Sequence, residues 1–441
     1  MKVLLIHLGD SHSGGGGGIA MHRLYTQFRK SGVDARILCQ WKTIVSPYIS
    51  TLPSTTRLES WLRKVTSRLG LNDIYKLSSF KIKDLDVFKQ ADIVDFQGIH
   101  SGTLSYLALP VLTKTKPAVF TLHDMWAFTG HCAYTYECTR WQTGCGQCPH
   151  LDSLPAVMRD GTKIEWKLKS RVYKKANLSF VVPSQWLVQQ AHTSMLAPYP
   201  IHYIPHGVDV RQFQPLDPVQ CRKMLGISSK KKVLLFVAQN FKDKRKGGDL
   251  LLKALRRIPA TLQKESVLLS LGKAGEMDFH DLNMPVLNLG YVYHDRMKAI
   301  AYSAADLFLF PTRSDIFGLV SIESQACGTP VVSFRVGGVS EHVRSGLTGY
   351  LAEAENSDDF ASGIQELLED NSMRESLGQQ GRQMVLNEYT IELQTKRYLN
   401  LYRHLMNKGN GKSDEDLTQI SFENQKRPVC EATAEQETIE K

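Results

Sequence analysis

Two acidic residues, Asp315 and Glu323, stand eight positions apart in the segment SDIFGLVSIESQACGTPVVSF, which covers residues 314–334. In one continuous helix this spacing would place the two carboxylates about 80° apart around the axis, so they would not share a face. We therefore expect Asp315 to lie in a loop, the helix to begin near Gly318, and Glu323 to lie about a turn and a half inside it. This arrangement disfavours an acid/base pair.

The start of this helix has the features of a ligand-binding site. The amides of Phe317, Gly318 and Leu319 would point at an anion, because the first N–H groups of a helix have no partner within it. Glu323 is suited to accept hydrogen bonds from two vicinal hydroxyls, as an acid does with a ribose. No His or Cys neighbour supports a metal site here.

A basic loop, NFKDKRKGG, follows an apolar run at 233–238. Arg245 and Lys246 precede two glycines and a helical pattern, so two cations and a helix N-terminus would lie at the carboxyl end of a strand. Arg offers a planar fork and Lys a point charge, which together suit a diphosphate. The alternative is a solvated basic loop.

Two further loops follow strands of the first half. Five glycines, Gly14 to Gly18, precede a helical pattern, and their spacing matches neither the dinucleotide fingerprint nor a P-loop. They favour close approach of an anion or a sugar over a merely flexible loop. His123 and Asp124 come directly after the apolar run AVFTL, where ligands of parallel sheets bind.

Four cysteines occur within seventeen residues: Cys132, Cys138, Cys145 and Cys148. Four thiolates can bind a structural zinc ion and stabilise a loop that has little core of its own. The spacing of five between the first two differs from the usual pattern, so packing cysteines, disulfides and an iron–sulfur cluster stay open as alternatives. None of these makes the loop catalytic.

Short apolar runs alternate with helical patterns almost throughout the chain, which predicts α/β architecture with parallel sheets covered on both faces. Two such series predict two doubly wound, Rossmann-like domains that face each other across a cleft. We expect a first domain at 1–203 with a cysteine-rich loop at 131–149, a second at 204–384, a returning helix at 385–408 and a disordered acidic tail at 409–441. The expected strands are 2–8, 34–40, 92–96, 118–122, 178–183, 233–238, 267–271, 286–290, 306–311 and 330–334.

The charge is uneven along the 441 residues. The net charge is +10, and the last 33 residues hold four basic and eight acidic side chains, so residues 1–408 carry +14. This favours an anionic partner, but there is no aromatic-interleaved basic stripe, so we expect no nucleic acid. No apolar stretch reaches the length of a membrane span and no signal peptide is evident, which predicts a cytoplasmic protein without a disulfide framework.

Read in order, these segments resemble the retaining glycosyltransferases of family 4, which have the GT-B fold. The resemblance covers roughly residues 1–405 and rests on the glycine-rich loop, TLHD, VPSQW, IPHGVD, RKGG, GYV, the 308–332 segment FLFPTRSDIFGLVSIESQACGTPVV, and GGVSEHV with GLTGYL. The segment HDMWAFTGHC with its cysteines further resembles a bacterial subset linked to exopolysaccharide and lipopolysaccharide assembly.

The resemblance implies transfer of a sugar from a UDP- or GDP-sugar, with retention and without a required metal, to a glycan or lipid-linked acceptor. It places Gly15, Gly16, Gly17 and Gly18 beside the donor, His123 at the sugar, and Arg245 and Lys246 at the phosphates. It places Asp315 at the sugar hydroxyls, the amides of residues 317–319 at the phosphate, and Glu323 at the ribose. In the family the first acid of the pair is usually Glu, so Asp315 is one methylene shorter.

The acceptor is encoded only weakly. Residues 57–77 are basic and amphipathic, with Trp61 and Leu69 near helical spacing. They predict either a helix packed on the first domain or peripheral docking on the anionic inner face of the plasma membrane. Alternatives to a transferase are an inactive sugar-nucleotide-binding protein and a nucleotide-sugar epimerase of the same fold.

Overall fold

The computed structural model describes residues 1–273 and 282–409, and two parallel sheets organise them. The first sheet has the strand order β3-β2-β1-β4-β5-β6-β7. Its strands are β1 (Lys2–Gly9), β2 (Asp34–Trp41), β3 (Ile49–Thr51), β4 (Ile93–Phe96), β5 (Ala118–Thr121), β6 (Ser179–Val182) and β7 (Ile201–Tyr203). Its helices are α1 (Gly15–Lys30), α2 (Arg57–Arg68), α3 (Asp86–Gln90), α4 (Leu109–Leu112), α5 (Thr162–Tyr173) and α6 (Gln185–His192).

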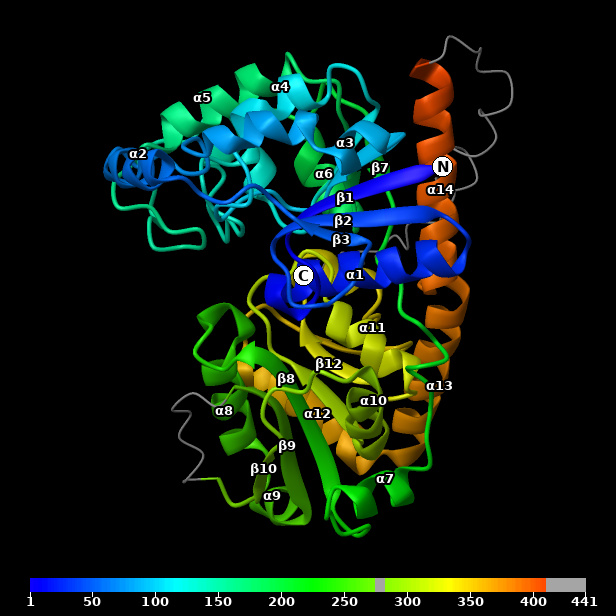
Figure 1. Ribbon diagram of the computed structural model, residues 1–441. Coiled ribbons are helices and arrows are strands. Elements are labelled where there is room, and N and C mark those ends of the chain that lie inside the picture. The colour runs from blue at the N-terminus through cyan, green and yellow to red at the C-terminus, as the bar shows by residue number, and fades with distance from the viewer. Residues whose placement is uncertain (274–281, 410–441) are drawn as a thin grey trace, which may run out of the picture.

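The second sheet has the order β10-β9-β8-β11-β12-β13 and forms the second domain. Its strands are β8 (Lys232–Asn240), β9 (Ser266–Lys273), β10 (Val286–Asn288), β11 (Leu307–Phe310), β12 (Val331–Phe334) and β13 (Gly349–Ala352). The helices of this half are α7 (Pro218–Met224), α8 (Gly248–Arg257), α9 (Ala260–Glu265), α10 (Asp295–Ala304), α11 (Leu319–Ala326), α12 (Ser357–Glu369), α13 (Asn371–Glu388) and α14 (Ile391–Gly409). Figure 1 shows the two domains one above the other.

The predicted fold class, two doubly wound parallel-sheet domains, is confirmed. Every strand expected from an apolar run is present within a few residues of its predicted bounds. Three short strands, β3, β7 and β13, were not predicted. In both sheets the order runs outward from the first strand in two directions, so loops at the carboxyl ends of the strands converge where the order reverses.

Strand β1 shows why continuous apolar strands require this layering. Leu4 and Ile6 pack into one apolar cluster, whereas Val3 and Leu5 pack into another together with Leu24 of α1. Side chains of alternate residues point to opposite faces of a strand, so both faces of the sheet are covered. Burial on both faces is the main stabilising term of such a sheet.

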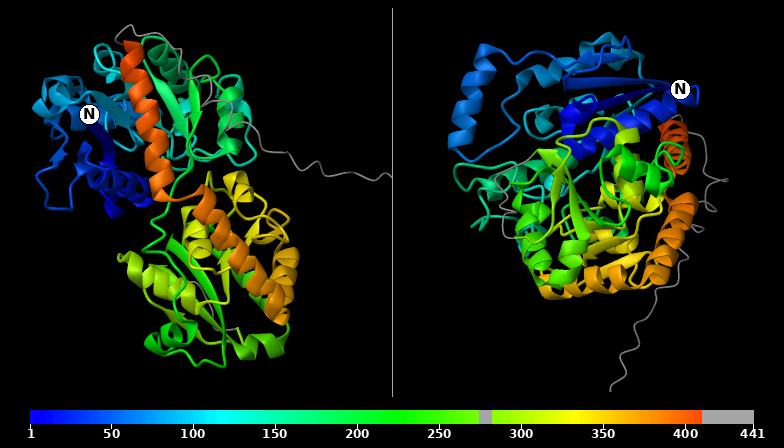
Figure 2. Two further views of the ribbon diagram at one scale, coloured as in Figure 1. Left: turned by 90° about the vertical axis from the view of Figure 1, so that its right-hand side faces the viewer. Right: turned by 90° about the horizontal axis from the view of Figure 1, so that it is seen from below.

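The chain crosses between the domains twice, and the two crossing segments meet. Val208 forms a parallel bridge with Thr390. The predicted helical segment 385–408 is divided at this point, because α13 ends at Glu388 and α14 begins at Ile391. Helix α14 then lies against the first domain, as the left view of Figure 2 shows. Its Tyr398 and Tyr402 pack into an apolar cluster with residues of β1 and α1.

Two sequence expectations concern the ends of the molecule and the membrane. The acidic tail at 409–441 lies, apart from Gly409, outside the described residues. Among the helices described in 1–273 and 282–409, none combines the length and apolar character that crossing a bilayer requires.

Candidate active site

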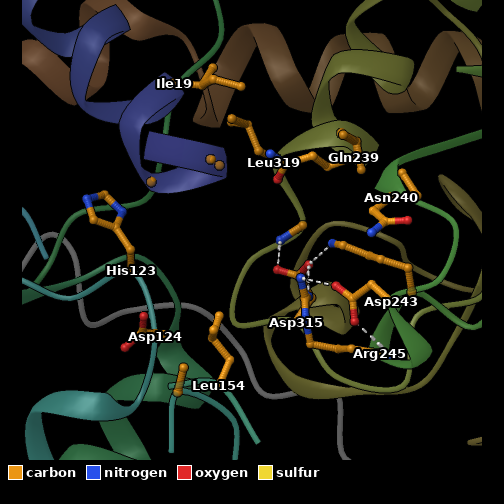
Figure 3. A pocket seen from close by; sticks show the side chains of 18 of the residues that line it. Ile19, His123, Asp124, Leu154, Gln239, Asn240, Asp243, Arg245, Asp315 and Leu319 are labelled. Carbon is orange, nitrogen blue, oxygen red and sulfur yellow. Dashed lines mark hydrogen bonds and ion pairs between the residues drawn. The ribbon is translucent and has the colours of Figure 1, made fainter. Parts of the chain in front are cut away.

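A cleft of about 910 Å³ lies between the two domains, at the carboxyl ends of their strands. Its walls bring together the predicted residues of both halves (Figure 3). They are Gly15, Gly16, Gly17, His123, Arg245, Lys246, Asp315, Phe317, Gly318, Leu319 and Glu323. Of the predicted donor-side residues, Gly18 is absent from these walls. The predicted residues that do line the cleft extend from Gly15 to Glu323, which are 308 positions apart in the chain.

The glycines of the first loop have different roles. A Cβ on Gly16 would meet nothing within 4 Å, whereas one on Gly17 would lie 3.1 Å from Cγ of His123. A Cβ on Gly18 would lie 2.3 Å from the carbonyl oxygen of Ser11, which no side chain can accept without movement of the backbone. A side chain is therefore excluded at Gly18 by packing inside the first domain, whereas Gly16 faces the open space of the cleft.

His123 is a neutral imidazole in the wall of the first domain. Burial, followed by the nearby His206 and His7, lowers the pKa of His123 well below its usual value. Its Nε2 lies 2.9 Å from Oε1 of Gln97, and its Nδ1 is buried without a hydrogen-bond partner among the described residues. The adjacent Asp124 pairs with His100, at 2.7 Å between Oδ2 and Nε2.

Arg245 and Lys246 lie in a short 3₁₀ turn that follows β8, and both contact Asp315. Nζ of Lys246 is 3.0 Å and Nη1 of Arg245 is 3.3 Å from Oδ2 of Asp315. Burial alone would raise the pKa of Asp315, but Lys246 and then Arg245 hold that pKa well below its usual range. The Arg245 guanidinium also lies 4.3 Å from the ring centroid of Tyr134, a residue of the cysteine-rich loop.

The other oxygen of Asp315 caps helix α11. Oδ1 accepts hydrogen bonds from the amides of Gly318, at 2.9 Å, and Phe317, at 3.3 Å. As expected, Asp315 precedes the helix, which begins at Leu319 after Gly318 adopts a left-handed conformation (φ 82°). Two amides expected to face a phosphate are thus directed at Asp315, whose predicted contact with the sugar stays a prediction.

Glu323 is held from both domains. Its Oε1 pairs with Nη2 of Arg23 in α1 at 2.8 Å, and its Oε2 accepts from the hydroxyl of Tyr302 at 3.1 Å. Arg23 also donates to Asp295 at 3.1 Å. Glu323 is 2% exposed yet lines the cleft. Arg23 and Tyr302 were not predicted from the sequence. Both lie in the middle of helices, and nothing in their sequence positions indicates that they contact Glu323 in another helix.

The four clustered cysteines lie in one neighbourhood of the first domain. Burial and nearby thiols raise the pKa of Cys132 to about 12, and burial raises that of Cys145 to about 11. Across 1–273 and 282–409, no three His, Cys, Asp or Glu side chains are arranged to hold a metal ion, and the seven cysteines there are unpaired. Structural zinc stays a prediction. The loop meanwhile contributes Tyr134 and Tyr136 to the cleft.

Both halves of the chain match family models. Residues 14–212 match the model described as Glycosyltransferase Family 4, and residues 220–384 match Glycosyl transferases group 1. The two halves thus resemble two glycosyltransferase domains in sequence. A curated relative, D-inositol 3-phosphate glycosyltransferase 1 of Catenulispora acidiphila, is 36% identical over 188 residues, which are 40% of this chain and 44% of that protein. The match thus spans less than half the length of this relative.

Solved structures confirm that the two domains are arranged in the predicted GT-B fold. Sucrose-phosphate synthase from Thermosynechococcus elongatus superposes with a TM-score of 0.66 at 20% identity, covering 92% of this chain and 99% of that one. Anabaena HepE in complex with UDP-glucose superposes with a TM-score of 0.60 at 16% identity, covering 91% and 99%. At these identities the likeness shows the fold.

The two helical glycines of α1 give a matched pair of substitutions. Gly16→Ala should leave the free energy of unfolding unchanged or raise it by about 0.5–1 kcal/mol, because alanine is the better helix former. Gly18→Ala should lower it by about 1–3 kcal/mol, because the new methyl group overlaps the Ser11 carbonyl. Guanidinium unfolding followed by circular dichroism measures both. Equal stability of the two variants would contradict the packing role of Gly18.

Asp315→Asn should keep a hydrogen-bond acceptor at the helix cap but remove the carboxylate that pairs with both buried cations, which leaves Arg245 with Asp243 and Lys246 without this partner. We expect a loss of about 3 kcal/mol at pH 7. Because the folded-state pKa of Asp315 is depressed, its stabilisation is complete above the unfolded pKa of about 4 and is lost as the pH falls below it. The difference from wild type should therefore shrink below about pH 4.

The control for this prediction is Asp249→Asn, since Asp249 pairs with Arg313 at the surface and its side chain is 53% exposed. Its loss should stay below about 1 kcal/mol. Guanidinium unfolding at a series of pH values measures both variants. A difference for Asp315→Asn that is small at pH 7, or that grows toward low pH, would contradict the ion-pair assignment.

Proposed function

We propose that the protein transfers a sugar, with retention at the anomeric carbon, from a UDP- or GDP-sugar to a hydroxyl group of an acceptor. The observation that carries this proposal is the pair of buried cations, Arg245 and Lys246, on one wall of the cleft with the neutral His123 on the other. The resemblance of both halves to glycosyltransferase domains supports it, as does the UDP-glucose bound by HepE.

Arg245 and Lys246 would stabilise the diphosphate leaving group. As the bond from the anomeric carbon to the phosphate oxygen breaks, negative charge grows on the diphosphate, and preorganised cations lower the energy of that state. Asp315 pairs with both cations, and Asp243 pairs with Arg245 at 3.4 Å. Lys242 and Lys244 line the same wall, so its four cations outnumber these two carboxylates before the ligand arrives. In this proposal the side chains supply the charge, and no metal ion is required.

Glu323 would bind the ribose of the donor. Its two oxygens already interact with Arg23 and Tyr302, which fix the orientation of the carboxylate. A carboxylate has about four acceptor positions, so vicinal hydroxyls can share it with both partners. The nucleotide would then extend from Glu323 past the cations toward His123.

The acceptor is proposed to be a glycan or a lipid-linked sugar used in cell-surface polysaccharide synthesis, and helix α2 would dock the protein on an anionic membrane. Leu58 and Trp61 of α2, and Leu69, which follows its last residue, are 56%, 59% and 57% exposed. At helical spacing these three positions fall within about 80° of one another and so share one face. Arg57, Lys64 and Arg68 border that face. Of the residues in α2, Glu59 alone is buried, so the helix packs little on the first domain. An exposed apolar face bordered by cations suits an anionic lipid surface.

Nucleotide binding and donor consumption test the proposed function. Isothermal titration with UDP and GDP should show that one of them binds, and Glu323→Gln should weaken it roughly tenfold, since a charge-assisted hydrogen bond is worth about 1.5–3 kcal/mol. Asp295→Asn is the control, because Asp295 shares Arg23 with Glu323 but does not line the cleft. It should change affinity less than about twofold.

Product analysis separates the alternatives. A transferase consumes the matching nucleotide sugar only when an acceptor is present, and the anomeric coupling of the product by NMR reports retention. Conversion of the donor without an acceptor would indicate an epimerase, and binding without any conversion would indicate an inactive binder. Failure of both UDP and GDP to bind would contradict the proposal.

Vesicle flotation tests the docking of α2. Wild-type protein should float with vesicles that contain phosphatidylglycerol and not with phosphatidylcholine alone, and Trp61→Ser should reduce binding about tenfold by removing buried apolar area. Val219→Ser is the control, because Val219 is 60% exposed on α7 of the second domain. Equal binding of wild type to both kinds of vesicle, or an equal loss in the control, would contradict the assignment.

A further inference from the structure

A line of hydrogen bonds runs from the C-terminal helix through the first sheet to the cleft. The hydroxyl of Tyr402 in α14 donates to Oδ2 of Asp95 in β4 at 2.5 Å. The same oxygen accepts from Nε2 of Gln97 at 2.8 Å, and Oε1 of Gln97 lies 2.9 Å from Nε2 of His123. Tyr402, Asp95 and Gln97 are at most 1% exposed, so water does not compete for these groups.

The donors and acceptors in this line have fixed directions. Burial raises the pKa of Asp95 to about 6, so at neutral pH Asp95 is ionised and can only accept. It accepts from Tyr402, from Gln97 and from Thr121, whose Oγ1 is 2.9 Å from Oδ1. Gln97 must therefore turn its amide nitrogen toward Asp95 and its oxygen toward His123.

The orientation of Gln97 decides the state of His123. An amide oxygen only accepts, so the proton of the neutral ring must be on Nε2. The other nitrogen, Nδ1, then holds a lone pair and can only accept a hydrogen bond. This nitrogen is buried and has no partner among the described residues, which is a costly arrangement unless a ligand supplies a donor.

We propose that Tyr402, Asp95 and Gln97 are positioning residues that hold His123 in the Nε2–H tautomer, so that Nδ1 accepts a hydrogen bond from a hydroxyl of the donor sugar. The inference rests on the proposed function for the identity of the ligand, but the tautomer itself is a property of the free protein. It assigns a specificity requirement as well, since the sugar must present a hydroxyl, rather than only an acceptor oxygen, to His123.

The same network gives the C-terminal helix a role in the active site. Tyr398 lies one turn before Tyr402, and its hydroxyl oxygen is 3.2 Å from Oγ1 of Thr121. Because the Thr121 proton is directed at Asp95, Tyr398 donates in this pair. Two tyrosines of α14 thus add hydrogen bonds to side chains of β4 and β5 in the first sheet.

The first test is the tautomer in the ligand-free protein. Long-range ¹H–¹⁵N NMR distinguishes protonated from unprotonated ring nitrogens, and the signals of His123 among the 14 histidines are assigned from their absence in His123→Gln. At pH 7.5 wild type should show Nε2 protonated and Nδ1 unprotonated. Gln97→Met, which keeps the length but neither hydrogen bond, should give a mixture of tautomers. An Nδ1–H form in wild type, or identical spectra, would overturn the inference.

The second test is a double-mutant cycle on kcat/KM with the nucleotide sugar. Gln97→Met should lower it about tenfold and Tyr402→Phe about threefold, while the double variant should be no worse than Gln97→Met, because Tyr402 acts only through Gln97. Tyr199→Phe, which removes a hydroxyl of the first domain outside the network, should leave kcat/KM unchanged. If the loss of kcat/KM in the double variant equals the product of the two single losses, the inference about the network is overturned.

The two tests keep the inference separate from the proposed function. The expected tautomer in a protein that binds no nucleotide sugar would support the network and contradict the function. Normal turnover together with an unchanged spectrum in Gln97→Met would support the proposed function and contradict the role of the network.

Discussion

The cleft depends on the placement of two buried cations beside one buried carboxylate. At 3.0 Å, the distance between Lys246 and Asp315, the Coulomb attraction is about 5 kcal/mol at an effective dielectric constant of about 20. This is of the same order as the several kcal/mol that burial costs each ion. The attraction within the Lys246–Asp315 pair therefore comes close to offsetting the cost of burying it. Arg245 has a second carboxylate, Asp243, at 3.4 Å, and the excess of positive charge on this wall comes from Lys242 and Lys244. Under the proposed function, this positive wall would be in place before the anionic donor binds.

The remaining contacts of the cleft hold groups from both domains against this wall. Arg23 of the first domain fixes Glu323 of the second, and α14 crosses from the second domain to complete the hydrogen bonds of Asp95 in the first. Each domain thus supplies a part that orients a side chain of the other. Under the proposed function, Glu323, the cations and His123 would set the order of the ligand's groups along the cleft.

The sequence was sufficient for the fold class and for most of the strands. Runs such as VLLFVA and FLF are apolar on both faces, which in a chain of alternating helices predicts buried parallel strands. The missed strands β3 and β7 are three residues long and lie at the sheet edges, and β13 has four residues at the edge of the second sheet. Edge strands are covered less completely, so their composition carries little of the apolar signal.

In the candidate site, the residues that could be recognised from the sequence are those in loops directly after strands, and the residues that support them were missed. Arg245, Asp315 and His123 were found because ligands of parallel sheets bind beyond the carboxyl ends of the strands. Asp95 lies inside a strand and Tyr402 inside a helix, 307 residues apart, and neither position is unusual by itself. A buried carboxylate in a strand requires donors, but which segment supplies them depends on how the two domains close. The hydrogen-bond partners of such a carboxylate are therefore determined by the tertiary structure, and they can orient a side chain of the site only once the fold has formed.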